Sequence, residues 1–313
     1  MADRQDVQTA FGDLLTIDGG ASLSSWSQVW SARVHGGAED VPAVVKQTWS
    51  SPEPLEAWQR TLVARGIRTV APLLPVATVG DGSADAEHWV AYPRLAGSTW
   101  DGGAADLAAA GRLLGEMHAA SAELVIDGFP GFEWGNPERD SIDEDIEAIR
   151  ASAAEHWPSA DVERWVAQLD GFPQLLERVR AADVPQLPAS LDHRADNLLF
   201  DAEGALMLDL ENAALAPRIL DLAVAALLFP LEHAGSGGNA LGSDEWVAFR
   251  DAYLAASPLT RQERELWPAA LTYMKLEWGT WHLTEGVEPE PTGNLGYLED
   301  LLTLDEHARY PLA

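Results

Sequence analysis

The chain contains no cysteine, which excludes disulfides, thiolate metal sites, iron–sulfur clusters and a cysteine nucleophile. Positive charge is also scarce, because 20 Lys and Arg residues stand against 50 Asp and Glu residues, a net charge of −30. Binding to nucleic acid or to an anionic membrane needs clustered Lys and Arg, so we expect neither partner. The acidic surface either favours solubility or attracts a cationic substrate.

Long apolar runs are absent as well. No stretch reaches the ~18 residues that a membrane helix needs, and the longest run, Leu220–Leu228, contains Asp221. The N-terminus, MADRQDVQTA, lacks the cationic start and apolar centre of a signal peptide. We therefore expect a cytoplasmic protein. Its hydrophobic content of 47% is that of a globular protein with a substantial core, which excludes a wholly disordered chain.

Strand patterns dominate the first part of the chain. Short segments rich in apolar and β-branched residues alternate there with turn signals, and one helical segment interrupts them. Strands are predicted at Ser27–Val34, Pro42–Thr48, Val70–Val79 and His88–Tyr92, and a helix at Ser51–Gly66. This pattern predicts a small, β-rich N-terminal lobe over residues 1–95.

Helical periodicity dominates the remainder, with one short hairpin embedded in it. Helices are predicted at Asp106–Ser121, Ile142–Glu155, Asp161–Leu169, Gln174–Ala182, Asp221–Leu228, Ser243–Ala256 and Thr260–Thr284, and hairpin strands at Asn197–Asp201 and Ala205–Leu210. The sequence therefore predicts an α+β fold of two lobes, with a larger α-helical lobe over residues 96–313. Small-molecule sites tend to lie in the cleft between such lobes.

A set of oxygen-bearing side chains flanks the predicted hairpin. Asp192 precedes Asn197 by five positions, and the second hairpin strand ends at Asp209. Phosphoryl transfer needs a carboxylate that takes the proton of a hydroxyl, and hard oxygen ligands for the Mg²⁺ that bridges the ATP phosphates. Upstream, Lys46 ends an apolar strand, where its ammonium can reach phosphate oxygens, and Glu56 on the next helix can pair with it.

Each of these assignments has a structural alternative. An Asp and an Asn five positions apart occur by chance in acidic proteins, and Lys46 can be an ordinary lysine at the end of a strand. Glu56 competes with Glu53, and both can be acids favoured by the helix dipole. His118 lies on an apolar helix face and is interpreted as a core histidine.

The order of these motifs resembles the aminoglycoside phosphotransferase-like (choline kinase-like) family, a branch of the protein-kinase-like fold. That family carries H-G-D-x-x-x-x-N-L-L, then I-D-W-E, then D-L-A, where this chain reads S-L-D-H-R-A-D-N-L-L, L-D-L-E and L-D-L-A. The resemblance implies that Asp192 is the catalytic aspartate and that Asn197 and Asp209 are metal ligands. It also implies that Asp221 is a buried aspartate that shapes the catalytic loop.

Two departures from the family pattern lie directly before Asp192. Ser190 replaces the family's loop histidine, and Leu191 replaces the glycine that follows it. The histidine usually supports the loop, so its loss implies a change in local packing. The string from His193 to Asn197 resembles the protein-kinase His-Arg-Asp loop, but its third position is Ala195, so only the register from Asp192 gives the required spacing.

The nucleotide side is less specific. Ser24, Ser25 and Ser27 lie where the family has a phosphate-covering loop, whose backbone N–H groups can bind phosphates, although a simple polar turn is the alternative. Tyr92 and Arg94 lie in the segment that should connect the lobes, and its backbone would bond adenine. The alternative is an ordinary linker, and Pro93 removes one donor.

The acceptor side rests on helical spacing alone. Tyr273, Glu277 and Trp281 fall on one face of a predicted helix and can present aromatic rings and a carboxylate to a polar or cationic ligand. The alternative is that the aromatic residues belong to the core and that Glu277 is a solvated acid.

Together these patterns predict an ATP- and Mg²⁺-dependent kinase that phosphorylates a hydroxyl of a small molecule, with GTP as an alternative donor. The resemblance and the acidic charge favour an aminoglycoside or nucleoside antibiotic as acceptor, and thus antibiotic resistance. The alternatives are a metabolic kinase acting on an amino sugar, sugar or amino alcohol, and a nucleotide-binding pseudokinase. A protein kinase is disfavoured, because the chain has no Asp-Phe-Gly or Ala-Pro-Glu segment.

Overall fold

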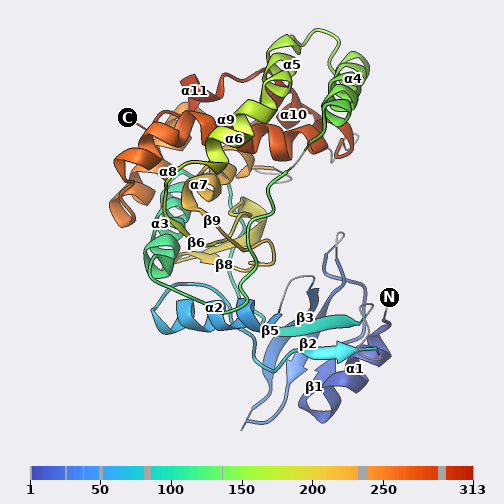
Figure 1. Cartoon of the computed structure of the whole chain (residues 1–313). Coiled ribbons are helices and arrows are strands. Elements are labelled where there is room, and N and C mark those ends of the chain that lie inside the picture. The colour runs from blue at the N-terminus through green and yellow to red at the C-terminus, as the bar shows by residue number, and fades with distance from the viewer. Residues whose placement is uncertain are drawn as a thin grey trace.

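The structure is a computed structural model that describes residues 2–24, 27–37, 39–48, 52–80, 86–135, 137–231, 239–287 and 294–312. Figure 1 shows a β-sheet with two helices beside it and, above them, a larger helical part. The sheet is antiparallel and has the strand order β1-β2-β3-β5-β4. Its strands are β1 (Leu15–Ile17), β2 (Val29–Val34), β3 (Val41–Thr48), β4 (Ala77–Val79) and β5 (Glu87–Pro93). This division confirms the predicted α+β fold with a small β-rich lobe and a larger helical lobe.

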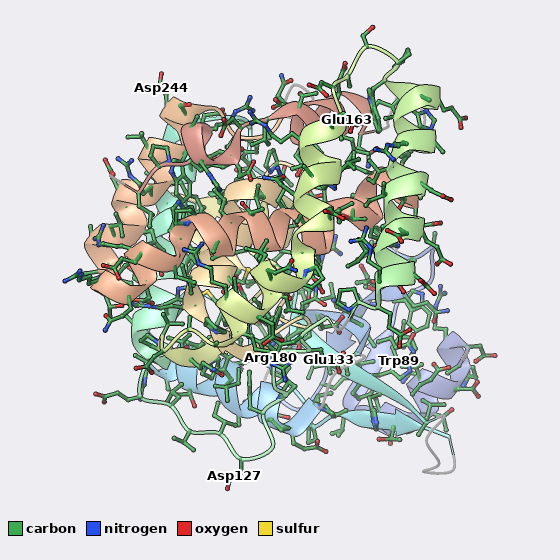
Figure 2. The ribbon with its side chains drawn as sticks, turned by 45° about the horizontal axis from the view of Figure 1, so that its top comes forward. Trp89, Asp127, Glu133, Glu163, Arg180 and Asp244 are labelled. Carbon is green, nitrogen blue, oxygen red and sulfur yellow. The ribbon has the colours of Figure 1, made fainter. Side chains whose placement is uncertain are left out.

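The two helices beside the sheet belong to different cores. Helix α1 (Arg4–Phe11) buries Val7 and Phe11 in the core of the sheet, where Trp30 and Trp89 stack with their ring centroids 4.9 Å apart; Trp89 is labelled in Figure 2. The apolar residues of helix α2 (Pro52–Ala64) pack instead into the core of the helical part, and Trp58 donates to the Ser121 hydroxyl at 2.9 Å. Helix α2 therefore lies at the boundary of the two parts (Figure 1).

The predicted strand Val70–Val79 is wrong over most of its length. Only Ala77–Val79 forms a strand, because Pro72 and Pro75 interrupt the ladder that a longer strand would need. The segment still follows β5, since the N–H of Leu73 donates to the carbonyl of Ala91 at 2.8 Å. The other strands and the helix predicted before residue 95 are present with shifts of a few residues at their ends.

The helical part is built around two buried helices. Every residue of α7 (Arg218–Leu228) is buried, and most residues of α9 (Arg261–Thr284) are too. The other helices are α3 (Ala104–Ser121), α4 (Arg139–His156), α5 (Glu163–Asp170), α6 (Phe172–Arg180), α8 (Ser243–Ala256), α10 (Leu295–Thr303) and α11 (Glu306–Arg309). No helix in the described ranges is both long enough and apolar enough to cross a bilayer.

Helices α3 and α8 touch backbone to backbone. A Cβ on Gly111 would lie 2.1 Å from the carbonyl oxygen of Phe249, and one on Gly115 would lie 2.7 Å from that of Tyr253. Only glycine permits this approach at both positions, which lie one helical turn apart on the same face of α3. The close contact fixes α3, and with it His118, relative to α8.

Two small antiparallel sheets lie between the large sheet and the helices. Strand β6 (Gln186–Ala189) pairs with β9 (Ala214–Pro217), and β7 (Leu198–Asp201) pairs with β8 (Gly204–Met207). A 3₁₀ turn, η2 (Ala195–Asn197), leads into β7. The two pairings bring the loop 190–197 and the segment 208–213 to the same place, although the sequence separates them by a hairpin.

Candidate active site

Asp221 on helix α7 holds the loop that carries Asp192 through hydrogen bonds. The carboxylate of Asp221 accepts hydrogen bonds from the N–H of Ser190 at 2.8 Å, from the N–H of Leu191 at 2.9 Å and from the Ser190 hydroxyl at 3.0 Å. The side chain of Asp221 is fully buried. Burial alone would raise its pKa, but hydrogen bonds from His118 and from the loop lower the pKa of Asp221 below its usual value. Asp221 is therefore an ionised anchor for the loop.

The two departures from the family pattern have a structural explanation. Leu191 has φ +54°, the left-handed region in which glycine is favoured, and it is the one non-glycine residue with positive φ in the described ranges. Its N–H bond to Asp221 and its buried side chain hold it there. At the position of the family's loop histidine, the Ser190 hydroxyl bonds Asp221, and the imidazole of His118 on α3 contacts the same carboxylate.

His118 is a core histidine, as its sequence position indicates. Its Nε2 lies 2.9 Å from the Asp221 carboxylate and its Nδ1 lies 2.8 Å from the Tyr253 hydroxyl. Tyr253 lies on α8, at the point where Gly115 of α3 touches that helix. The loop that carries Asp192 is thus connected through Asp221 and His118 to the α3–α8 contact.

Asp192 is almost fully buried and is surrounded by hydrogen-bond donors. Its Oδ2 accepts from Asn197 Nδ2 at 2.8 Å and from Asn212 Nδ2 at 3.0 Å, while its Oδ1 lies 2.8 Å from Arg194 Nε. Burial raises the pKa of Asp192 to about 6, against the opposing effects of Arg194 and the two asparagines. A carboxylate in such a state is ionised at neutral pH and is still a stronger base than an exposed aspartate.

Lys46 is paired with two acidic residues of the segment that follows β8. Its ammonium bonds the carboxylate of Asp209 and lies 2.9 Å from Glu211 Oε2. Burial opposes the charge, but these two carboxylates raise the pKa of Lys46 above its usual value. Burial in turn raises the pKa of Glu211 to about 7, even though Lys46 opposes this shift. Lys46 of strand β3 and Asp209 therefore lie side by side.

The partner expected for Lys46 differs from the one that the structure shows. Glu56 lies on α2 and forms an ion pair with Arg60 at 2.7 Å, one turn along the same helix. The apolar face of α2 packs against the helical part, which leaves Asp209 and Glu211 as the acids that reach Lys46. The Lys46–Glu56 pair is thus not formed in this structure.

The donor set fits a divalent cation that also binds phosphate oxygens. Asn197 donates from its Nδ2 to Asp192, which leaves its Oδ1 to act as an acceptor, and one carboxylate oxygen of Glu211 is buried without a hydrogen-bond partner among the described residues. The described residues contain no cluster of three or more His, Asp or Glu side chains that would enclose a metal on their own. Mg²⁺ needs no such cage, because one or two carboxylates and substrate phosphates usually complete its shell.

The serine loop connects β1 and β2, next to Lys46. The N–H of Ser27 donates to the Ser24 hydroxyl at 3.4 Å, and the Ser22 hydroxyl bonds the carbonyl of Ser27 at 2.9 Å. Because Val29 pairs with Lys46 across the sheet, this turn ends beside the lysine. Ser25 lies outside the described residues.

In the segment that follows β5, the backbone groups available for a ligand belong to Pro93 and Leu95 and not to Tyr92 and Arg94. The Tyr92 side chain is buried and bonds Gln59 of α2, and the N–H of Arg94 already donates to the carbonyl of Pro42 at 2.9 Å. In an antiparallel pair the bonded residues alternate, so the Pro93 carbonyl and the Leu95 N–H point away from β3. The Arg94 side chain bonds the Ser31 hydroxyl at 2.9 Å.

The three residues expected on the acceptor side have different environments. Tyr273 is fully buried and stacks on Phe172 with ring centroids 5.6 Å apart, so its ring is part of the core and does not face a ligand. Glu277 is half-buried, and burial raises its pKa. Trp281 is 53% exposed and contacts the edge of His282. Tyr273 and Glu277 thus lie together, whereas Trp281 is a surface residue.

A stretch of chain between α3 and α4 completes the surroundings of Glu277. A Cβ on Gly135 would lie 3.1 Å from a Glu277 oxygen, and Trp134 packs against Tyr273. Gly131 forms a bridge with Leu215 of β9, which joins this stretch to the segment that carries Asn212. Glu133 is labelled in Figure 2 where this stretch runs between the helices and the sheet.

Sequence reasoning missed three residues of this site. Glu211 belongs to the L-D-L-E motif, so its acidic side chain two positions after Asp209 was the available signal. Asn212 follows it and has no signal of its own, because its contact with Asp192 depends on the β6–β9 pairing. Arg194 was treated only as part of a misleading kinase-like string, although it touches Asp192.

Comparison with known proteins is consistent with this geometry. The sequence model of the phosphotransferase enzyme family matches residues 42–267. The chain belongs to that family. The match spans the lysine strand, the Asp192 loop, Asp209 and α7, so all of these residues lie within the part of the chain that the family model covers. No curated protein matches the sequence of this phosphotransferase.

Solved structures show the fold of this phosphotransferase family member. An amicoumacin kinase, solved with AMP-PNP and Ca²⁺, has a TM-score of 0.64 at 16% identity, covering 90% of this chain and 86% of that one. A microcompartment-associated aminopropanol kinase has a TM-score of 0.62 at 16% identity and covers 97% and 96%. A choline kinase from Streptococcus pneumoniae has a TM-score of 0.58 at 13% identity and covers 97% and 98%. The fold is therefore the two-lobe, protein-kinase-like one that the sequence predicts.

Proposed function

We propose that this phosphotransferase moves the γ-phosphoryl group of ATP to a hydroxyl of a small molecule. Asp192 takes the hydroxyl proton, Asn197 and Asp209 hold Mg²⁺, and Lys46 contacts the phosphates of the nucleotide. The observation that carries the proposal is that five polar side chains from three separate segments of the chain lie together. They are the buried carboxylate of Asp192, the amide of Asn197, the carboxylates of Asp209 and Glu211, and the ammonium of Lys46. Phosphoryl transfer depends on positioning and charge neutralisation, which this set can supply.

Mg²⁺ would neutralise phosphate charge and orient the γ-phosphoryl group when it is bound. The chain's own part is to hold Asp192 rigidly, which Asn197, Asn212 and the Asp221 anchor do. AMP-PNP and Ca²⁺ in the amicoumacin kinase support a nucleotide and a divalent ion as ligands here. Glu211, two residues after Asp209, pairs with Lys46 and would offer a further carboxylate to the metal.

The nucleotide would lie on the side of residues 1–95 and the acceptor on the side of residues 96–313. The serine turn beside Lys46 would cover the phosphates, and the outward Pro93 carbonyl and Leu95 N–H would bond the adenine. Among the described residues, no backbone partner is recorded for these two groups. Because their pattern of one acceptor and one donor suits the exocyclic amine and a ring nitrogen of adenine, we favour ATP over GTP.

The acceptor would carry a positively charged nitrogen in addition to its hydroxyl. Glu277 is half-buried beside Tyr273 and Trp134, and no ion pair is recorded for it among the described residues. A desolvated carboxylate favours a cationic ligand. The net charge of −30 also attracts such a ligand.

An aminoglycoside or nucleoside antibiotic is the first candidate for this acceptor, and an amino alcohol or amino sugar is the second. The first is supported by the likeness to an amicoumacin kinase, and the second by the likeness to kinases named for aminopropanol and choline. All of these candidates combine a hydroxyl with a nitrogen that can carry charge.

An acceptor panel tests this proposal. ADP release would be measured with Mg²⁺ and ATP against aminoglycosides, nucleoside antibiotics, amino sugars, amino alcohols and matched neutral sugars and alcohols. We expect turnover with a cationic acceptor, and we expect Glu277→Gln to raise its KM about tenfold or more, the loss of roughly 1.4 kcal/mol of charge pairing.

Glu265→Gln is the matched control, since Glu265 is an exposed acid on the same helix that pairs with Arg261. Its KM should equal that of the wild type. Turnover with neutral acceptors alone, or an unchanged KM in Glu277→Gln, would contradict the cationic assignment. ATP binding with no turnover on any acceptor would favour a nucleotide-binding pseudokinase.

A further inference from the structure

Arg194 is the cation closest to the base that the proposed function requires. It lies two residues after Asp192, and its Nε is 2.8 Å from Asp192 Oδ1. Its side chain is 23% exposed, whereas that of Asp192 is 9% exposed, so the arginine is the more exposed member of the pair. Backbone bonds from Arg194 N to Asp192 O and from Asn197 N to Arg194 O close the turn that holds it there.

The contacts of Asp192 show which oxygen meets the acceptor. A carboxylate oxygen accepts about two hydrogen bonds, and Oδ2 already accepts from Asn197 and Asn212. The hydroxyl of the acceptor must therefore approach Oδ1, the oxygen that Arg194 contacts. The guanidinium then lies beside the attacking hydroxyl, and so beside the phosphoryl group that is being transferred.

Arg194 also influences a residue of helix α9. Burial and the positive charge of Arg194 together lower the pKa of His282 to about 4, so the guanidinium lies within electrostatic reach of helix α9. Glu277, the residue proposed to bind the acceptor, lies on the same helix. Arg194 is thus a residue of the Asp192 loop that lies within electrostatic reach of the helix that carries Glu277.

The second cation of the site is Lys46. Lys46 is shared by Asp209 and Glu211, which also face the metal position. The transferred group spreads its charge over three equatorial oxygens in the transition state. A planar guanidinium, which offers several N–H donors in a fixed fork, matches two of these oxygens better than a lysine does.

We propose that Arg194 is a catalytic residue that leaves Asp192 Oδ1 and binds the γ-phosphoryl group during transfer. The proposal rests on the proposed function. In the step, the acceptor oxygen forms a bond to the γ-phosphorus and the bond from that phosphorus to the bridging oxygen breaks. ADP departs with that electron pair, and the hydroxyl proton passes to Asp192 Oδ1, which the departure of Arg194 has freed.

The test compares Arg194→Gln and Arg194→Lys with the wild type. Each protein would be assayed for ADP release with the best acceptor of the panel and with water as acceptor, and for binding of MgADP with and without aluminium fluoride, which mimics the transferred phosphoryl group. For Arg194→Gln we expect kcat to fall by a factor on the order of 10²–10³, with the MgADP affinity and the KM for ATP within about threefold of wild type. The extra affinity for MgADP with aluminium fluoride should be lost, and Arg194→Lys should restore part of kcat.

Arg139→Gln is the control, because Arg139 is an exposed arginine of α4 that pairs with Asp143 and Asp170. Its kcat should equal that of the wild type. Arg194→Gln with wild-type kcat, or with a loss confined to KM while the aluminium fluoride affinity persists, would overturn the proposal. A wild type that neither binds MgATP nor releases ADP would instead overturn the proposed function itself, and the role of Arg194 with it.

Discussion

Asp192 combines two properties that a buried carboxylate rarely has together. It is desolvated enough to be a useful base, and it is held by donors that keep it ionised near neutral pH. Asn197 and Asn212 supply two of these donors on the same oxygen. Since both amides stabilise the charged form, each of them lowers the pKa that burial raises.

A pH profile follows from this balance. The carboxylate must be ionised to take the proton, so kcat/KM should fall as pH is lowered through about 6, tenfold per pH unit below it. Asn212→Ala removes a donor to the charged form and should move this acid limb to higher pH. The profiles would be measured from about pH 4.5 to about pH 8 with both proteins. An acid limb that stays in place, or moves to lower pH, would show that Asn212 does not tune Asp192.

For single residues, the sequence predicted the contacts that depend on short spacing along the chain and missed the contacts that depend on tertiary packing. Asp192, Asn197 and Asp209 were predicted to lie together because one loop and one hairpin connect them. The partner of Lys46 was not, because the orientation of α2 is decided by its contacts with the helical part, as the Trp58–Ser121 bond shows. Asn212 reaches Asp192 only through a strand pairing between distant segments.

Helix α3 connects the core to the catalytic loop. Its glycines touch the backbone of α8, and one turn later His118 bonds both Tyr253 and the Asp221 anchor. The Ala- and Leu-rich pattern of α3 and the apolar segments of α8 and α9 predicted these helices well. Strands β6 and β9 were missed, because four-residue strands carry too little periodicity to be told from loops.

Gly111→Ala tests the α3–α8 contact. The added Cβ would meet a backbone carbonyl at 2.1 Å, and neither helix can yield there without a shift. We expect the free energy of unfolding to fall by about 1–3 kcal/mol or more, which outweighs the gain of about 1 kcal/mol in helix propensity. Urea unfolding measures the change, and kcat should fall as well because His118 moves with α3.

Gly19→Ala is the control for this substitution, since nothing lies within 4 Å of its added Cβ. Its stability should stay within about 0.5 kcal/mol of wild type. If Gly111→Ala were as stable as Gly19→Ala, the close packing of the two helices would not be needed for the fold.

At the scale of the whole molecule, the site lies where the sheet and the helical part meet. Lys46 comes from the sheet, and Asp192, Asn197 and Asp209 come from the helical part, so neither part holds the complete set. The ion pair between Lys46 and the Asp209–Glu211 segment bridges the two parts. The acidic surface adds a long-range attraction for a cationic acceptor, which salt would weaken.

The most direct measurement is ADP release by the wild type and by Asp192→Asn, with Mg²⁺, ATP and the acceptor found in the panel, together with binding of Mg²⁺ and AMP-PNP to both proteins. The account predicts that Asp192→Asn lowers kcat by a factor on the order of 10² to 10⁴, the usual contribution of a positioned base. Nucleotide binding should persist, since Lys46, Asn197 and Asp209 are unchanged. Turnover by Asp192→Asn close to that of the wild type would contradict the central claim that this carboxylate is the base of the reaction.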